Sequence, residues 1–193
     1  YKLSDILGYT VAIPGVVLND VVVFAPNTDI FGLNFKEELG LLLENDNIIV
    51  ENDANLQAMA EAKATGLDDL ILISIGTGLG GGIIIDGKLL NKNGFAGEIG
   101  HIKVHFGANS RMCGCGKLGC SEAYVSCKAI VKDYNDINHT NVNSKELFDL
   151  ARAKDKLAIK CINDCARYLA ITIATVVATT GIKEVHIAGG LSN

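Results

Sequence analysis

The sequence predicts an α/β fold whose sheet mixes parallel and antiparallel strands. Two observations carry this prediction. Segments rich in β-forming residues alternate with segments of helical spacing along the 193 residues, and several neighbouring strands are joined by turns short enough for hairpins. Alternating strands and helices are typical of α/β proteins, whereas the hairpins exclude a purely parallel sheet.

The first part of the chain begins with two β-rich segments. They flank turn-forming dipeptides and are predicted to be strands of a meander: Tyr9–Ile13 and Val16–Phe24, with turns at Pro14-Gly15 and Asn19-Asp20. A helix is predicted over Phe35–Leu43 because its apolar residues recur at helical spacing. A short buried strand, Ile48–Val50, then ends at polar residues, of which Asn52 or Asp53 can cap the next helix.

The rest of the chain continues the alternation, with no repeat and no low-complexity linker. Strands are predicted at Leu70–Ile75, Gly82–Ile85 and Glu184–Ala188, and helices at Ala54–Ala64, Ser121–Asp133, Ser144–Ala153 and Asp155–Thr179. The dipeptide Asp86-Gly87 supplies a tight hairpin turn after the second of these strands.

The composition is that of a globular protein with 49% hydrophobic residues, 20% charged residues and a net charge of −5. A chain of this length can bury one large core or two small ones. Lys and Arg form no cluster, which argues against a nucleic-acid surface. The apolar segment Tyr168–Ile182 is shorter than the roughly 18 to 20 residues of a membrane span and contains four threonines, so a buried helix is predicted.

Both ends of the sequence are expected to lie inside domains, because the chain starts at Tyr1 and stops just after Gly189-Gly190. A signal peptide or a DNA-binding segment upstream is therefore left open. Of six cysteines, Cys127, Cys161 and Cys165 fall in predicted helices, where buried thiols are expected. This cysteine usage favours a reducing cytoplasm over disulfide bonding.

A glycine-dense run, Gly76-Thr77-Gly78-Leu79-Gly80-Gly81, satisfies the dinucleotide pattern G-x-G-x-x-G. That pattern requires a helix after the glycines, whereas a strand and a hairpin turn follow here, so a Rossmann site is excluded. Two interpretations remain. The bare backbone can cradle phosphates, with a hydroxyl from Thr77, or the glycines can serve only to let the sheet bend and pack.

Polar residues Glu51-Asn52-Asp53-Ala54-Asn55 stand where a strand enters a helix. Two interpretations remain. Asn52 and Asp53 serve as helix caps and nothing more, or Asp53 faces a cleft and takes a proton from a hydroxyl as general base. At the other end of the chain, Gly189-Gly190 follows a buried strand and can bring backbone close to a flat ligand such as adenine.

The spacing Cys113-x-Cys115-x4-Cys120, with His101 upstream, predicts a closed tetrahedral Cys3His zinc site of the structural kind. His105 competes with His101 as the fourth ligand. Glu98 and Glu122 lie on either side of the predicted site, where they are either presented to a ligand or solvated on the surface.

Together these motifs resemble the ROK family of repressors, open reading frames and kinases, in the family's order along the whole chain. The resemblance is carried by APN (Ala25–Asn27), ENDAN (Glu51–Asn55), ISIGTGLGGG (Ile73–Gly82), AGEIGH (Ala96–His101) and CGCGKLGCSEA (Cys113–Ala123). It implies the actin-like ATPase fold, with two ribonuclease-H-like lobes and a cleft between them. Residues 1–54 would be the end of the first lobe and 55–193 most of the second.

The resemblance implies a cytoplasmic sugar kinase that transfers the γ-phosphoryl group of ATP to the 6-hydroxyl of a hexose, with glucose as the first candidate. Mg2+ would accompany ATP, Zn2+ would be structural, and the enzyme would be a homodimer or homotetramer. Residue by residue, it implies these roles: general base Asp53; sugar ligands Asn52, Asp53, Glu98, His101 and Glu122; phosphate loop Gly76, Thr77 and Gly78; adenosine motif Gly189 and Gly190; zinc ligands His101, Cys113, Cys115 and Cys120.

The chain also departs from the family pattern. The Asp-x-Gly-x-Thr phosphate loop of the family is not among the 193 residues, so these residues alone are not expected to turn over substrate. Asn91–Gly94 is one residue short, Cys127 stands where Gly is common, and Leu191 replaces a third glycine. Three alternatives stay open: a sugar-responsive ROK repressor with an upstream helix-turn-helix, a kinase for N-acetylmannosamine or fructose, and a zinc-stabilised module that binds no nucleotide.

Overall fold

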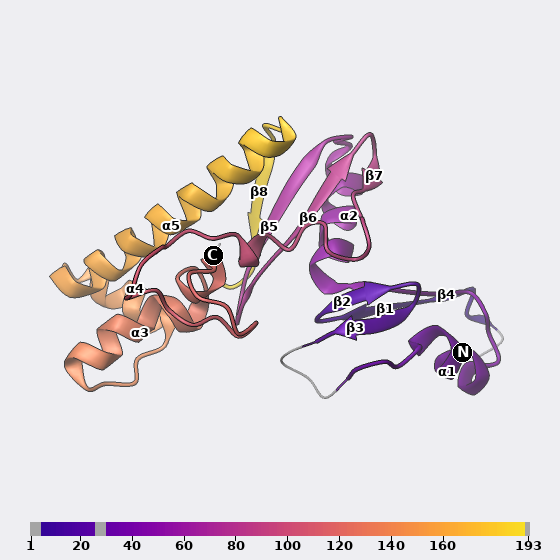
Figure 1. Ribbon diagram of the computed structural model, residues 1–193, viewed down its shortest axis with the longest axis horizontal. Coiled ribbons are helices and arrows are strands. Elements are labelled where there is room, and N and C mark those ends of the chain that lie inside the picture. The colour runs from indigo at the N-terminus through magenta and orange to yellow at the C-terminus, as the bar shows by residue number, and fades with distance from the viewer. Residues whose placement is uncertain (1–4, 26–29, 192–193) are drawn as a thin grey trace.

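A computed structural model describes residues 5–25 and 30–191, and its first strands form two separate ladders (Figure 1). Strand β1 (Tyr9–Ile13) pairs in parallel with β4 (Ile48–Asn52), whereas β2 (Val16–Leu18) and β3 (Val21–Phe24) form an antiparallel hairpin. Helix α1 (Phe35–Leu43) packs against β4 and β3.

The predicted meander is therefore wrong at its first turn, because β1 pairs with β4 and not with β2. Pro14 has no N–H to donate to a ladder. Gly15 turns the backbone through a φ of +144°, where a Cβ would lie 2.5 Å from the carbonyl oxygen of Phe24. The second turn is confirmed, since Asn19 and Asp20 both have positive φ, as a two-residue hairpin of type I′ requires.

A four-stranded sheet forms the centre of the rest of the molecule, in the order β7-β6-β5-β8. Its strands are β5 (Leu70–Ile75), β6 (Leu79–Ile85), β7 (Lys88–Leu89) and β8 (Val185–Ala188). Strand β6 is antiparallel to both β5 and β7, whereas β8 runs parallel to β5. The predicted mixed sheet is confirmed.

Helices cover both faces of this sheet (Figure 1). Helix α2 (Asp53–Thr65) lies on one face; α3 (Cys127–Asn138), α4 (Ser144–Arg152) and α5 (Lys156–Thr180) lie on the other. Side chains alternate along β5: Leu70 and Leu72 pack with α2, while Ile71, Ile73 and Ile75 join the core that includes α5. A separate core lies among β1 to β4 and α1.

Half of the glycine run belongs to a strand, because β6 begins at Leu79 and not at the predicted Gly82. A Cβ on Gly82 would lie 2.5 Å from the Cβ of Ala58 on α2, and one on Gly80 would lie 3.0 Å from Ala54. Gly80 and Gly82 therefore let α2 approach the sheet closely, which is the packing role that the sequence analysis gave as one of two interpretations of the glycine run. The loop itself is only Gly76–Gly78.

Helix α3 starts at Cys127, six residues later than predicted, and Ser121–Ala123 forms a separate 3-10 turn, η3. The physical reason is the Ser126 hydroxyl, which accepts a hydrogen bond from the N–H of Ala129 at 3.1 Å and so caps the helix. The thiol of Cys127 is half-buried, whereas Cys161 and Cys165 are buried as predicted.

The last helix, α5, has 25 residues and is long and apolar enough to cross a membrane by length and composition. It buries only one face, which packs on α3, α4 and η3. The expectation of a buried helix thus holds for that face alone. Such a helix is also common in the cores of globular proteins, so this finding is weak evidence for a membrane span.

Candidate functional site

The carboxyl ends of β5 and β8 bring two glycine loops together. Ser74 pairs with Ala188, so the chain leaves both parallel strands at the same edge of the sheet, toward Gly76 and Gly189. This edge is where open α/β sheets place ligands. Gly189 has a φ of +98°, and a Cβ there would overlap the backbone of Ile75, so the close approach requires glycine.

The loop Gly76–Gly78 is the tip of the β5–β6 hairpin, closed by the pairing of Ile75 with Leu79. The carbonyl oxygen of Gly76 accepts a hydrogen bond from the N–H of Cys127 at 2.9 Å, so α3 begins directly against the loop. Thr77 is exposed at the tip. Glycine backbone beside a helix N-terminus is a favourable environment for an anion such as phosphate.

Two of the predicted sugar-side residues, Glu98 and His101, lie next to each other. His101 Nε2 is 3.7 Å from Glu98 Oε2. Burial raises the pKa of the Glu98 carboxyl above its ordinary value, nearby His101 lowers it, and the carboxylates of Glu122 and Asp53 raise it further. The Glu98 carboxyl is therefore next to one imidazole and is influenced electrostatically by two other carboxylates.

Asn52 and Asp53 differ in what holds them. The side-chain oxygen of Asn52 caps α2 by accepting from the N–H groups of Ala54 at 2.9 Å and Asn55 at 3.1 Å, and its amide donates to the Gly15 carbonyl at 2.9 Å. Asp53 is exposed and accepts from the N–H of Ala54 at 2.9 Å. Of the two residues that the sequence offered as the cap of α2, the structure selects Asn52. The carboxylate of Asp53 faces solvent.

Glu122 joins the carboxyl group cluster to the glycine loop. Its Oε2 accepts a hydrogen bond from the N–H of Leu79 at 3.1 Å, and its Oε1 lies 3.4 Å from the sulfur of Cys113. A Cβ on Gly78 would overlap Oε2. One carboxylate therefore contacts both the candidate phosphate loop and the predicted zinc ligands.

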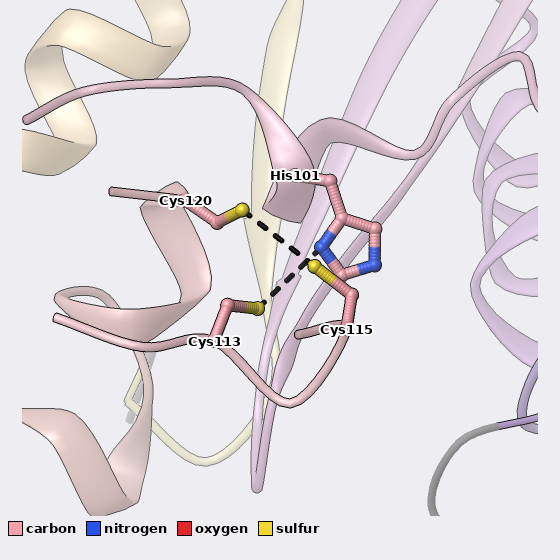
Figure 2. Close-up of side chains that lie close together, drawn as sticks. All are labelled: His101, Cys113, Cys115 and Cys120. Atoms are coloured by element: carbon pink, nitrogen blue, oxygen red, sulfur yellow. Dashed lines mark hydrogen bonds between the residues drawn. The ribbon is translucent and has the colours of Figure 1, made fainter. Parts of the chain in front are cut away.

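The four predicted zinc ligands lie together, with their ligand atoms all within 4.8 Å of one another (Figure 2). Cys115 and Cys120 are 3.7 Å apart at sulfur, and Cys113 is 3.7 Å from His101 Nδ1. A tetrahedron with metal–sulfur bonds of 2.3 Å has ligands about 3.8 Å apart, so the donor set fits zinc in type and in spacing. Because Nδ1 faces the sulfurs, the other ring nitrogen of His101 is left toward Glu98.

His105 does not compete for this site. Its Nδ1 lies 3.0 Å from the hydroxyl of Ser110, and its ring stacks on Tyr124 with centroids 5.4 Å apart. The stack continues to Tyr168 on α5, whose centroid is 4.3 Å from that of Tyr124. Packing therefore assigns His105 a structural role.

The thiols differ in their electrostatic surroundings. Burial raises the pKa of Cys113, and nearby Glu122 and Cys120 raise it further. Burial also raises the pKa of Cys115, but hydrogen bonds from the Lys117 backbone and from the neighbouring thiols, with the charge of Lys103, lower it overall. A divalent cation would stabilise the thiolate forms, as expected of metal-binding cysteines.

The sequence analysis missed two cations, one beside the thiols and one that anchors the cysteine segment. Lys103 Nζ lies 3.1 Å from the sulfur of Cys120 and also donates to the carbonyl of Leu118. Arg111 ties the cysteine segment to α3 through Asp133 at 2.5 Å, with its guanidinium over the ring of Tyr124. The sequence offers one indication of Lys103 as a site residue, which is its position two residues after His101.

Pro26 and Asn27 of the predicted APN motif lie outside the described residues.

Comparison with known proteins agrees with these motifs. A model described as the ROK family matches residues 2–193. The chain is 32% identical over 214 residues to a glucokinase of Halalkalibacterium halodurans, covering 98% of the chain and 63% of the relative. It is 30% identical over 179 residues to the xylose repressor of Bacillus subtilis, covering 90% of the chain and 46% of the relative.

A solved structure with the same fold is a ROK family glucokinase from Streptomyces griseus in complex with glucose and AMPPNP. Its TM-score is 0.82 at 32% sequence identity, over 94% of this chain and 64% of that one. The predicted actin-like ATPase fold is thereby confirmed. The chain spans between 46% and 64% of the length of these relatives.

Proposed function

The chain belongs to the ROK family, and from that membership we propose that the full-length protein is a cytoplasmic sugar kinase, transferring the γ-phosphoryl group of ATP to the 6-hydroxyl of a hexose. Glucose is the first candidate substrate. The observation that carries the proposal is Glu122, whose carboxylate contacts Leu79 beside the glycine loop and shares its surroundings with Glu98. A donor phosphate at the loop and an acceptor sugar at the carboxyl groups would thus be neighbours.

In this proposal Asp53 is the general base. Its carboxylate is exposed at the start of α2 and near enough to Glu98 to affect the pKa of that group. A carboxylate there accepts the proton that the sugar hydroxyl loses as it attacks phosphorus. Asn52, Glu98, His101 and Glu122 would bind the other sugar hydroxyls. Phosphoryl transfer then depends mainly on positioning and on stabilisation of charge.

The nucleotide would lie along the loops at the carboxyl ends of β5 and β8. Gly76, Thr77 and Gly78 would contact the phosphates, and Gly189 and Gly190 the adenosine. When bound, Mg2+ neutralises charge on the phosphate oxygens. Zinc held by His101 and the three cysteines would be structural, since all four positions of the tetrahedron are protein ligands. It would fix His101 and Glu122 in the wall of the sugar site.

We also propose that residues 1–54 end one lobe and 55–193 form most of the other. Separate cores support this division, because residues of β1 to β4 and α1 pack together while α2 packs on the central sheet. The sugar site would then receive Asp53 from the junction and Glu98, His101 and Glu122 from the second lobe.

A second candidate is a ROK repressor that binds sugar as a signal. The observation in its favour is the 30% identity to the xylose repressor of Bacillus subtilis. The carboxylate of Asp53 favours the kinase, because a sensor of sugar needs no general base. The two candidates predict different outcomes in one assay.

The test measures ATP-dependent release of ADP by the full-length protein with a panel of hexoses and N-acetylhexosamines. Turnover that depends on one sugar establishes the kinase and its substrate together. No turnover with any sugar, combined with sugar binding measured by calorimetry, contradicts the kinase and supports the repressor.

Replacing Gly78 with Ala is expected to raise the sugar KM about tenfold, because the added Cβ overlaps Glu122 and displaces a carboxylate that binds sugar. Gly76→Ala is the matched control. A Cβ at Gly76 has nothing within 4 Å in the described protein, so it should leave Glu122 in place. Because Gly76 would contact the phosphates in this proposal, the variant should raise the KM for ATP instead. Equal effects of both variants on both substrates would contradict this arrangement of the two subsites.

A further inference from the structure

Ser121 lies between a predicted zinc ligand, Cys120, and the site carboxylate Glu122, and it is fully buried at 0% exposure. Its backbone N–H donates to the carbonyl of Ile102 at 2.8 Å, next to His101. Its own carbonyl accepts from the N–H of Val125 at 2.8 Å. Ser121 therefore connects the two segments that supply the zinc ligands.

The hydroxyl of Ser121 meets the hydroxyl of Thr172 on α5 at 2.5 Å, and Thr172 is also 0% exposed. Thr172 Oγ1 donates to the carbonyl of Tyr168 at 2.9 Å. Because a hydroxyl has one hydrogen, Ser121 is the donor to Thr172, and both buried hydroxyls are satisfied. This pair is the hydrogen bond by which α5 holds the η3 turn.

Thr172 differs from the other threonines of α5. Thr175, Thr179 and Thr180 donate to the carbonyls four residues earlier, at 2.8, 2.7 and 2.9 Å. These contacts stay within the helix, and Thr175 and Thr179 are exposed. Thr172 makes the same contact and in addition accepts a hydrogen bond from another element.

We propose that Thr172 is a positioning residue that, through Ser121, holds Cys120 in the zinc cluster and Glu122 against Leu79. Side chains on either side of a residue move with it, so a shift of Ser121 disturbs both the Cys120–Cys115 spacing of 3.7 Å and the Glu122–Leu79 hydrogen bond of 3.1 Å. Misplacement of a reacting group by about 1 Å can cost about a hundredfold in rate. The catalytic part of this inference rests on the proposed sugar kinase function.

The test compares Thr172→Val with Thr175→Val in the full-length protein. Valine keeps the branched shape and removes the hydroxyl, which leaves the buried Ser121 hydroxyl without its acceptor. Thr172→Val is expected to weaken zinc binding about tenfold in a chelator competition, to alter the Co2+–thiolate absorption band, and to raise the sugar KM more than the ATP KM. Thr175→Val, which loses the same contact within the helix, should change none of these readouts.

Two further variants separate positioning from simple destabilisation. Thr172→Ser keeps the hydroxyl and is expected to restore zinc affinity and sugar KM. Ser121→Ala removes the donor of the same hydrogen bond and should reproduce the effects of Thr172→Val. The proposal therefore stays testable if Thr172→Val fails to fold. A lower melting temperature with unchanged zinc affinity and sugar KM would overturn the proposal. If the wild-type protein transfers no phosphoryl group, the zinc and Co2+ measurements still decide the role of Thr172.

Discussion

Replacing Asp53 with Asn in the full-length protein is expected to lower kcat by about a hundredfold to ten-thousandfold, the usual contribution of a general base. Asparagine keeps the size of the side chain and an oxygen that can accept from the N–H of Ala54, as Asp53 does at 2.9 Å. It cannot take a proton from the sugar hydroxyl. Sugar affinity, measured by calorimetry, should therefore change little while turnover, measured as ADP release, is lost.

Asp155→Asn is the matched control for this variant. Asp155 caps α5 by accepting from the N–H of Ala158 at 2.8 Å, so it is also a carboxylate at a helix N-terminus, but it lies outside the candidate site. Its replacement should leave kcat unchanged. Undiminished turnover in Asp53→Asn would remove Asp53 from the mechanism and leave its carboxylate a structural role.

Replacing Cys115 with Ser is expected to release zinc and to weaken sugar binding together, by about tenfold to a hundredfold in sugar KM. The physical reason is that the cluster also positions site residues, since His101 Nε2 faces Glu98 and Cys113 contacts Glu122. Without the metal, the segment that carries these groups loses its main crosslink. The zinc content, measured by mass spectrometry, should fall, and the sugar KM should rise with it.

The control for the cysteine variant is Cys161→Ser, which alters a buried thiol of α5 outside the cluster. It should retain one zinc ion per chain and an unchanged sugar KM. A Cys115→Ser protein that is free of metal yet has a normal sugar KM would show that the cluster does not support the sugar site.

The sequence predicted the local features of the site better than the long-range ones. Cys113, Cys115 and Cys120 lie close in sequence, so their spacing alone indicated a metal cluster, and the described structure gathers them with His101. The choice between His101 and His105 could not be made from spacing. It depends on the stacking of His105 on Tyr124 and on its edge contact with Tyr168, which lies on a helix far along the chain.

The errors in element boundaries have the same origin. The strand pairing of β1 was mispredicted because its partner, β4, lies beyond α1 in the sequence, while the adjacent β2 was the nearer candidate. Helix α3 was predicted to start at Ser121, but Ser126 caps it at Cys127, and the buried hydroxyl of Ser121 contacts Thr172 from a separate turn. Such contacts are set by tertiary packing, which pattern and propensity do not report.

The parallel pairing of β5 with β8 also constrains how the protein folds. Ile71 pairs with Val185, so two adjacent strands of one sheet are separated by about 110 residues of chain. Contacts of such high sequence separation form slowly, because the intervening chain must first lose conformational entropy. The hairpin of β5 and β6 can form from contacts close in sequence, whereas the loop at Gly189 is placed only when β8 pairs with β5. The candidate nucleotide site should therefore be completed late in folding, and hydrogen exchange during refolding should show protection of the β5–β6 hairpin before that of the β5–β8 pair.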